Sequence, residues 1–187
     1  AVRADGELCA VLSNGAGAMA LARAAWGELR SQYDCLLAAN PDPQVPADKM
    51  VFWARCRTWL RYRGYSQEIG KSCLVRFEAD PAGRFADWRF HVPCGMGRWV
   101  PLTLRLALAP GASRASLTLT RDSRKGGLDP HDAVHVNVRP DIEWRSFPHT
   151  TKAFLGPERE WAAAKRPDGA GFPFTPAPGE PLRPEAE

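Results

Sequence analysis

KMVFWARCRTWLRYR, residues 49–63, alternates between two kinds of side chain and decides the fold. One set of alternate positions holds small or apolar residues: Phe52, Ala54, Cys56, Thr58, Leu60 and Tyr62. The other set holds Trp53, Arg55, Arg57, Trp59, Arg61 and Arg63. A period of two is typical of a strand with one buried face, whereas an amphipathic helix spaces its apolar residues by three and four. The segment therefore predicts a long strand.

The same period recurs elsewhere and predicts an all-β protein. Four leucines share a face in residues 99–109, as do three valines in residues 133–139. Shorter strands are predicted at 9–12, 33–38, 73–78, 87–92, 116–121 and 142–147, with turn signals such as Asn14-Gly15 and Pro110-Gly111 between them. Many short strands with regular turns favour an antiparallel sandwich of roughly nine to eleven strands.

Two parts of the chain differ in composition from these strands. Residues 16–30 contain helix-forming Ala, Leu and Met, but glycines at 15, 17 and 27 interrupt them. After Gly156 the chain is rich in Pro, Gly and Ala. We therefore expect a sandwich domain over residues 1–156 and a tail over 157–187. In that tail residues 158–165 can form a short helix, Phe172-Pro173-Phe174 can form a last strand, and the end is typical of a linker.

Length, charge and cysteine content limit the function. A chain of 187 residues can bury one sizeable core but cannot also hold a toroidal catalytic domain. The net charge of +4 has no block of like charge, which argues against a nucleic-acid partner. No apolar run suggests a membrane span or a signal peptide. Five scattered cysteines without a CxxC pair indicate buried thiols, so we expect a cytoplasmic protein. The missing initiator Met suggests a fragment or a processed chain.

No hydrolytic, metal or cofactor motif is present, so we expect no catalytic residue, no metal and no cofactor. The four histidines lack metal-ligand spacing. Trp53 and Trp59, interleaved with arginines, remain candidate binding residues. Either a second layer or neighbouring domain covers them, or a sugar stacks on their rings while arginine donates to its hydroxyls.

Three stretches together resemble the N-terminal sandwich domain of bacterial glycogen-debranching (amylo-α-1,6-glucosidase) family proteins. They are VLSNGAGAMALARAAWGELRSQYDCLLAAN (residues 11–40), PQVPADKMVFWARCRTW (43–59) and VNVRPDIEWRSFPHTTKAF (136–154). The first resembles that domain's Asn-Gly turn and glycine-containing strand, which gives Asn14, Gly15 and Gly17 a structural role in the turn and predicts a strand within 16–30. The chain departs from the pattern at Ala18-Met19 and at Tyr33-Asp34-Cys35.

The resemblance implies a supersandwich-like accessory domain of a glycoside hydrolase whose α/α toroid, elsewhere in the same polypeptide, carries the catalytic carboxylic acids. The chain would not be catalytic alone; it would pack on the toroid and contribute to binding of a glycogen-like α-glucan. The alternatives are a stand-alone carbohydrate-binding module and a structural interaction sandwich.

One polar loop is the remaining candidate site. Pro148 has no N–H for a ladder bond, so the chain must leave the sheet after Phe147. The polar run around this point, residues 145–152, offers donors that suit sugar hydroxyls or carboxylates of a neighbouring domain: Arg145, His149, Thr150 and Lys152. The alternative is that Arg145 pairs with Asp141 or Glu143 and that the loop only organises itself.

Overall fold

A computed structural model describes residues 8–42, 48–122, 128–129 and 131–149. Those residues form one short 3-10 helix, η1 (Lys71–Cys73), and ten strands. The strands are β1 (Cys9–Ser13), β2 (Met19–Arg23), β3 (Cys35–Ala39), β4 (Met50–Tyr62), β5 (Tyr65–Glu68), β6 (Leu74–Ala79), β7 (Phe85–Gly95), β8 (Arg98–Leu108), β9 (Ala115–Arg121) and β10 (His135–Ser146).

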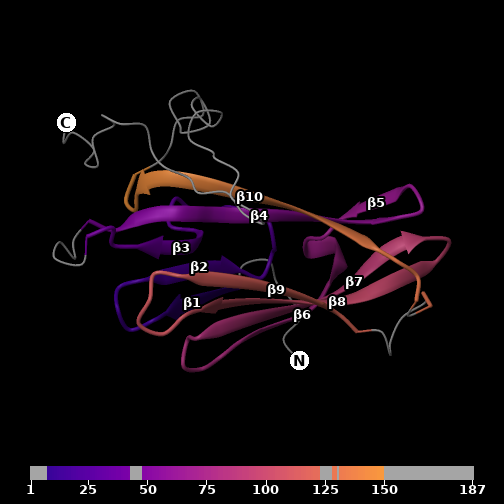
Figure 1. The fold of residues 1–187 in the computed structure, drawn as a ribbon, viewed down its shortest axis with the longest axis horizontal. Coiled ribbons are helices and arrows are strands. Elements are labelled where there is room, and N and C mark those ends of the chain that lie inside the picture. The colour runs from indigo at the N-terminus through magenta and orange to yellow at the C-terminus, as the bar shows by residue number, and fades with distance from the viewer. Residues whose placement is uncertain (1–7, 43–47, 123–127, 130, 150–187) are drawn as a thin grey trace.

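The strands form two antiparallel sheets that stack as a sandwich (Figure 1). The first sheet has the order β1-β2-β3-β4-β10, and β5 pairs with the C-terminal end of β4. The second has the order β6-β7-β8-β9. This arrangement confirms the predicted all-β antiparallel sandwich. The edge strands β9 and β10 have no outer neighbour among the described residues.

The core lies between the sheets because alternate residues of each long strand point inward. From β7 and β8 these are fully buried aromatic and branched side chains, among them Trp88, Phe90, Leu104 and Leu106. The Trp26 and Trp88 rings meet edge to face with 5.0 Å between centroids, which suits the quadrupoles of the two rings. The Trp26 Nε1–H donates to Thr58 Oγ1 at 2.8 Å, so the polar group on the inner face of β4 is satisfied.

Hydrogen bonds at one end of the sandwich hold the two sheets together. Ser13 N donates to Gly83 O at 2.9 Å, and Asn14 Nδ2 donates to Ala112 O at 2.9 Å. The Asn14 side chain also accepts from the N–H groups of Ala16 and Ala18, at 2.8 and 3.0 Å. Residues 14–18 thus form a compact turn, and Gly17 within it has a φ of +92° that a residue with a Cβ rarely adopts.

Two strand predictions differ from the structure in detail. Residues 133–139 and 142–147 were expected to be separate strands, but one strand, β10, runs through Pro140. Proline is tolerated there because β10 is an edge strand, where a missing N–H need not interrupt a ladder. Within 16–30 only Met19–Arg23 is a strand, and β5 was not predicted. The Phe172-Pro173-Phe174 strand and the 158–165 helix lie outside the described residues.

Candidate functional site

The outer side of β4 and β10 carries a group of arginines around a single carboxylate. Arg55 Nε donates to Asp141 Oδ2, Arg57 Nη2 lies 3.3 Å from Asp141 Oδ1, and Arg139 Nε lies 3.8 Å from the same oxygen. Alternation along β4 puts Trp59 on this side as well. We name this surface, defined by Arg55, Arg57, Trp59, Arg139 and Asp141, the β4–β10 outer face. Three guanidinium groups to one carboxylate leave it with excess positive charge.

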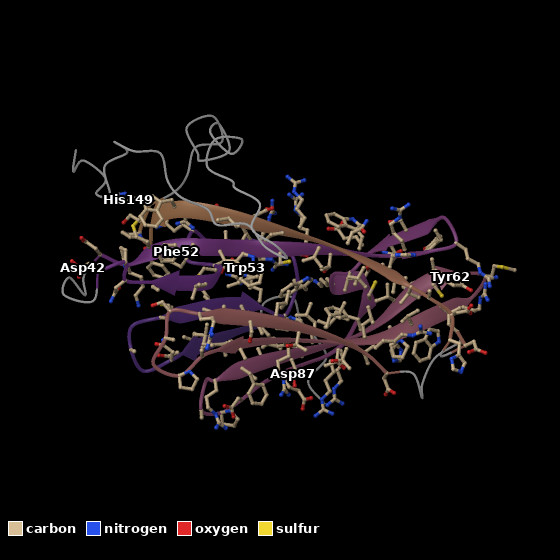
Figure 2. The ribbon with its side chains drawn as sticks, viewed as in Figure 1. Asp42, Phe52, Trp53, Tyr62, Asp87 and His149 are labelled. Atoms are coloured by element: carbon tan, nitrogen blue, oxygen red, sulfur yellow. The ribbon has the colours of Figure 1, made fainter. Side chains whose placement is uncertain are left out.

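The end of β10 places two predicted residues together. Arg145 Nε donates to Glu143 Oε2 at 2.6 Å, and its Nη1 donates to the backbone oxygen of His149. The Arg145 side chain is only 9% exposed, so its donors are engaged with the chain itself. The His149 side chain is exposed at the end of the molecule where β10 ends (Figure 2). Thr150 and Lys152 lie outside the described residues.

Trp53 lies apart from the β4–β10 outer face, and the expectation that it shares a face with Arg55, Arg57 and Trp59 is wrong. Register shifts interrupt β4 here: Leu37 pairs with Trp53 while Ala38 pairs with Val51, so β4 has an extra residue relative to β3. An extra residue reverses which side the next side chains face. Trp53 accordingly packs against the main core, on the side of β4 toward the second sheet (Figure 2). Its Nε1 donates to Arg55 O at 3.0 Å.

The same register shift makes the outer side of β4 apolar near the start of the strand. Val51 and Ala54 form a small second core with Cys35 and Ala38, and Phe147 packs against it. Tyr33, which is 42% exposed, meets the Phe147 ring at 5.2 Å between centroids. Phe147 N donates to Lys49 O at 2.8 Å, so the loop after β10 is anchored to the chain just before β4.

Trp53 borders an apolar cavity of about 460 Å³ that lies between the two sheets and is open to one side. The side chains around it come from β3, β4, β8, β9 and β10: Leu37, Phe52, Trp53, Thr58, Leu104, Leu117, Leu119, Val138, Pro140 and Ile142. None of these is ionisable, so the cavity supplies no group for acid–base chemistry. We name it the β9–β10 groove, since those edge strands form its sides.

The carboxylates of the described part of the chain are largely engaged with arginine. Asp34 is 2% exposed and accepts from Arg23 Nε at 2.6 Å and from the backbone N–H groups of Arg30 and Ser31. Asp87 accepts from Arg105 through both oxygens. Glycoside hydrolysis needs two carboxyl groups on opposite sides of the scissile bond, one of them able to donate a proton. The carboxylates of Asp34 and Asp87 are instead hydrogen-bond acceptors for arginine.

All five cysteines are free thiols. Burial raises the pKa of the Cys35 thiol to about 11 and that of the Cys56 thiol to about 12. The Asp141 carboxylate adds to the effect on Cys56 because it disfavours a second negative charge nearby. Both thiols are therefore protonated at neutral pH and serve as packing groups. No three His, Cys, Asp or Glu side chains in the described ranges come together as a metal site.

No helix among the described residues has the length and apolar character needed to cross a membrane.

Comparison with known proteins identifies the family. The family model described as "Glycogen debranching enzyme N terminal" matches residues 9–182. The chain belongs to this family. The comparisons with curated proteins and with solved structures found no match.

Membership in the debranching-enzyme N-terminal family confirms the resemblance in the sequence. The match also extends past β10 into residues that the structure does not describe. Among site residues, sequence reasoning missed Arg139, which belongs to the exposed side of an edge strand. Its alternation with Asn137 and Asp141 was a signal that could have placed it on one face with the β4 arginines.

Proposed function

We propose that this domain is the N-terminal accessory domain of a glycogen-debranching-type glycoside hydrolase and packs on the catalytic domain of the same polypeptide. The family match over residues 9–182 carries the proposal. The alternative, in which the sandwich acts alone as a carbohydrate-binding or structural module, has no observation of its own in its favour. The free thiols suit a cytoplasmic location, because disulfides are rare in reducing compartments.

The β4–β10 outer face is the surface that we assign to the catalytic domain. Interfaces between proteins are enriched in Trp and Arg, and this face combines Trp59 with arginines in excess of carboxylates. The Arg139 side chain is 66% exposed, and its Nε lies 3.8 Å from Asp141 Oδ1, so its guanidinium group keeps hydrogen-bond donors for a partner. The excess charge favours an acidic patch on the catalytic domain, since complementary potentials speed and orient docking.

Arg139→Glu should weaken the association of this chain with the separately produced catalytic domain about tenfold, which is about 1.4 kcal/mol. The charge reversal opposes an acidic partner without removing buried packing. Isothermal titration calorimetry at low salt measures the effect. Arg76→Glu on β6 is the matched control, because Arg76 is an exposed, ion-paired arginine on the second sheet. Equal affinities of wild type and Arg139→Glu would remove this face from the interface.

A contribution to α-glucan binding is the second part of the proposal, and it rests on the loop after β10. His149 is exposed there, while Arg145 holds the loop through the His149 backbone oxygen. Together with Thr150 and Lys152, His149 can offer hydrogen bonds to sugar hydroxyls at the border with the catalytic domain.

His149→Ala should raise the KM of the complete enzyme for a branched glucan roughly threefold and leave its Tm nearly unchanged, because one hydrogen bond is worth about 0.5–1.5 kcal/mol. Steady-state kinetics and a melting curve test this. His131→Ala, another exposed histidine, is the control. A lower Tm with unaltered KM would assign the loop to folding. If the isolated chain bound glycogen with the same affinity as the complete enzyme, the result would instead favour a stand-alone carbohydrate-binding module.

A further inference from the structure

The β9–β10 groove is an apolar surface that the described part of the chain leaves uncovered. Val138, on the edge strand β10, is 53% exposed, and Leu117 and Leu119 of β9 are only partly buried. Hydrogen bonds join the sheets at one end, between Ser13 and Gly83, and Arg121 at the end of β9 donates to backbone oxygens of Asp129 and Asp132. The sandwich is thus tied near both ends, while no residue of the described ranges closes the side between β9 and β10.

Water and sugar fit this groove poorly. A bound water needs two to four polar partners, and among the described lining residues only Thr58 has a side-chain hydroxyl. That hydroxyl already accepts from Trp26 Nε1 at 2.8 Å. A glucose unit would leave several hydroxyls without partners, at about 1–3 kcal/mol each. The occupant must therefore be apolar.

We propose that Phe172-Pro173-Phe174 of this same chain fills the β9–β10 groove as an added edge segment. The lining from β10 recurs every second residue, at Val138, Pro140 and Ile142. Phe172 and Phe174 have the same spacing, so in an extended segment both rings project from one side, about 7 Å apart along the strand. Pro173 restricts Phe172 to extended backbone and is tolerated in an edge position.

Chain length and family membership favour an occupant from within the chain. Residues 150–171 connect the described part to Phe172, and 22 residues can span about 70 Å when extended, far more than the return to the neighbouring edge of β10 needs. A tethered segment has an effective concentration near millimolar, which a free partner must exceed. The family match runs to residue 182, so this segment belongs to the same domain pattern as the sandwich. The inference does not depend on glucan binding or on a catalytic domain.

The test compares hydrogen exchange in the whole chain and in variants. The double variant F172A/F174A should increase amide exchange roughly tenfold in peptides that cover β9 and β10, because it opens the groove edges to solvent. Phe154→Ala, which removes a ring at another position after β10, is the matched control and should leave these rates unchanged. Mass spectrometry at two protein concentrations measures the exchange.

A second variant changes the groove itself and leaves residues 157–187 unaltered, so it tests the same contact from the other side. Val138→Lys puts a charge at the exposed mouth of the groove, so it should raise the same rates about as much as F172A/F174A. Combining the two should add nothing further, since both remove one contact. Unchanged exchange in F172A/F174A would overturn the proposal. So would an equal effect of Phe154→Ala, or protection that depends on protein concentration, which would identify a second copy as the occupant.

Discussion

At the scale of single residues, the buried polar side chains of β4 serve packing and not catalysis. Thr58 is 1% exposed and accepts a hydrogen bond from Trp26, so its hydroxyl is satisfied within the core. Cys56, also on the inner face, has a thiol that burial keeps protonated. On the outer face Arg55 and Arg57 share the Asp141 carboxylate. The fully buried side chains Cys56 and Thr58 are thus neutral, while the half-buried arginines are paired with a carboxylate, as desolvation requires.

The Cys56 thiol makes stability depend on pH in the alkaline range. Its pKa is about 12 in the folded protein and 9.0 without burial, so above pH 9 the unfolded chain loses a proton that the folded chain keeps. Deprotonation of the unfolded chain then favours unfolding. The stabilisation that comes from this protonated thiol is fully present below pH 9 and declines as the pH rises toward 12. Between pH 9 and 11 the free energy of unfolding should fall by about 2–3 kcal/mol more in the wild type than in Cys56→Ala.

Urea unfolding at several pH values measures this difference. Cys9→Ala is the control for replacing a thiol by a methyl group, because Cys9 is an exposed thiol in β1. The comparison of slopes is independent of the constant cost of the cavity that Cys56→Ala creates. Parallel profiles for the wild type and Cys56→Ala would contradict the predicted burial of the thiol.

At the scale of elements, alternation in the sequence was enough to predict the strands whose two faces differ in burial. In β8 the leucines at 102, 104, 106 and 108 are all buried, as period two requires. In β4 the same pattern placed Cys56, Thr58, Leu60 and Tyr62 correctly. It failed at Trp53 because a bulge depends on how β4 pairs with β3 and β10, and the residues of β4 alone do not show that pairing.

The other differences also have physical causes. Residues 133–139 and 142–147 were predicted as separate strands. They form one strand because a proline such as Pro140 interrupts a ladder only where a neighbour needs its N–H, and the edge position of β10 was not visible in the sequence. The hairpin that leads to β5 turns through Arg63 and Gly64, which both have positive φ. Arginine is an unusual residue for that conformation, so the turn gave no signal. Of the predicted loop, Arg145 and His149 do come together, but through a backbone oxygen.

At the scale of the whole molecule, the two sheets are joined by side chains as well as by apolar packing. Trp88 extends from β7 of the second sheet, and its Nε1 donates to the backbone oxygen of Arg23 in β2 of the first sheet at 2.9 Å. Trp88 is fully buried and contacts both Trp26 and Phe77 through its rings. Since the bond crosses from one sheet to the other, its loss should weaken the sandwich as a unit.

Trp88→Phe should lower the free energy of unfolding by about 1–3 kcal/mol, because the Arg23 oxygen is left without this donor inside the protein. The Tm should fall by about 2–4 °C for each kcal/mol. Trp144→Phe is the control for loss of an indole N–H, since Trp144, half-buried in β10, has a buried Nε1 without a hydrogen-bond partner, so that its removal breaks no bond. If the sheets unfold as one unit, far-UV circular dichroism and tryptophan fluorescence will give coincident transitions in both variants. Equal destabilisation by the two substitutions would show that lost ring volume, and not the hydrogen bond between the sheets, sets the cost.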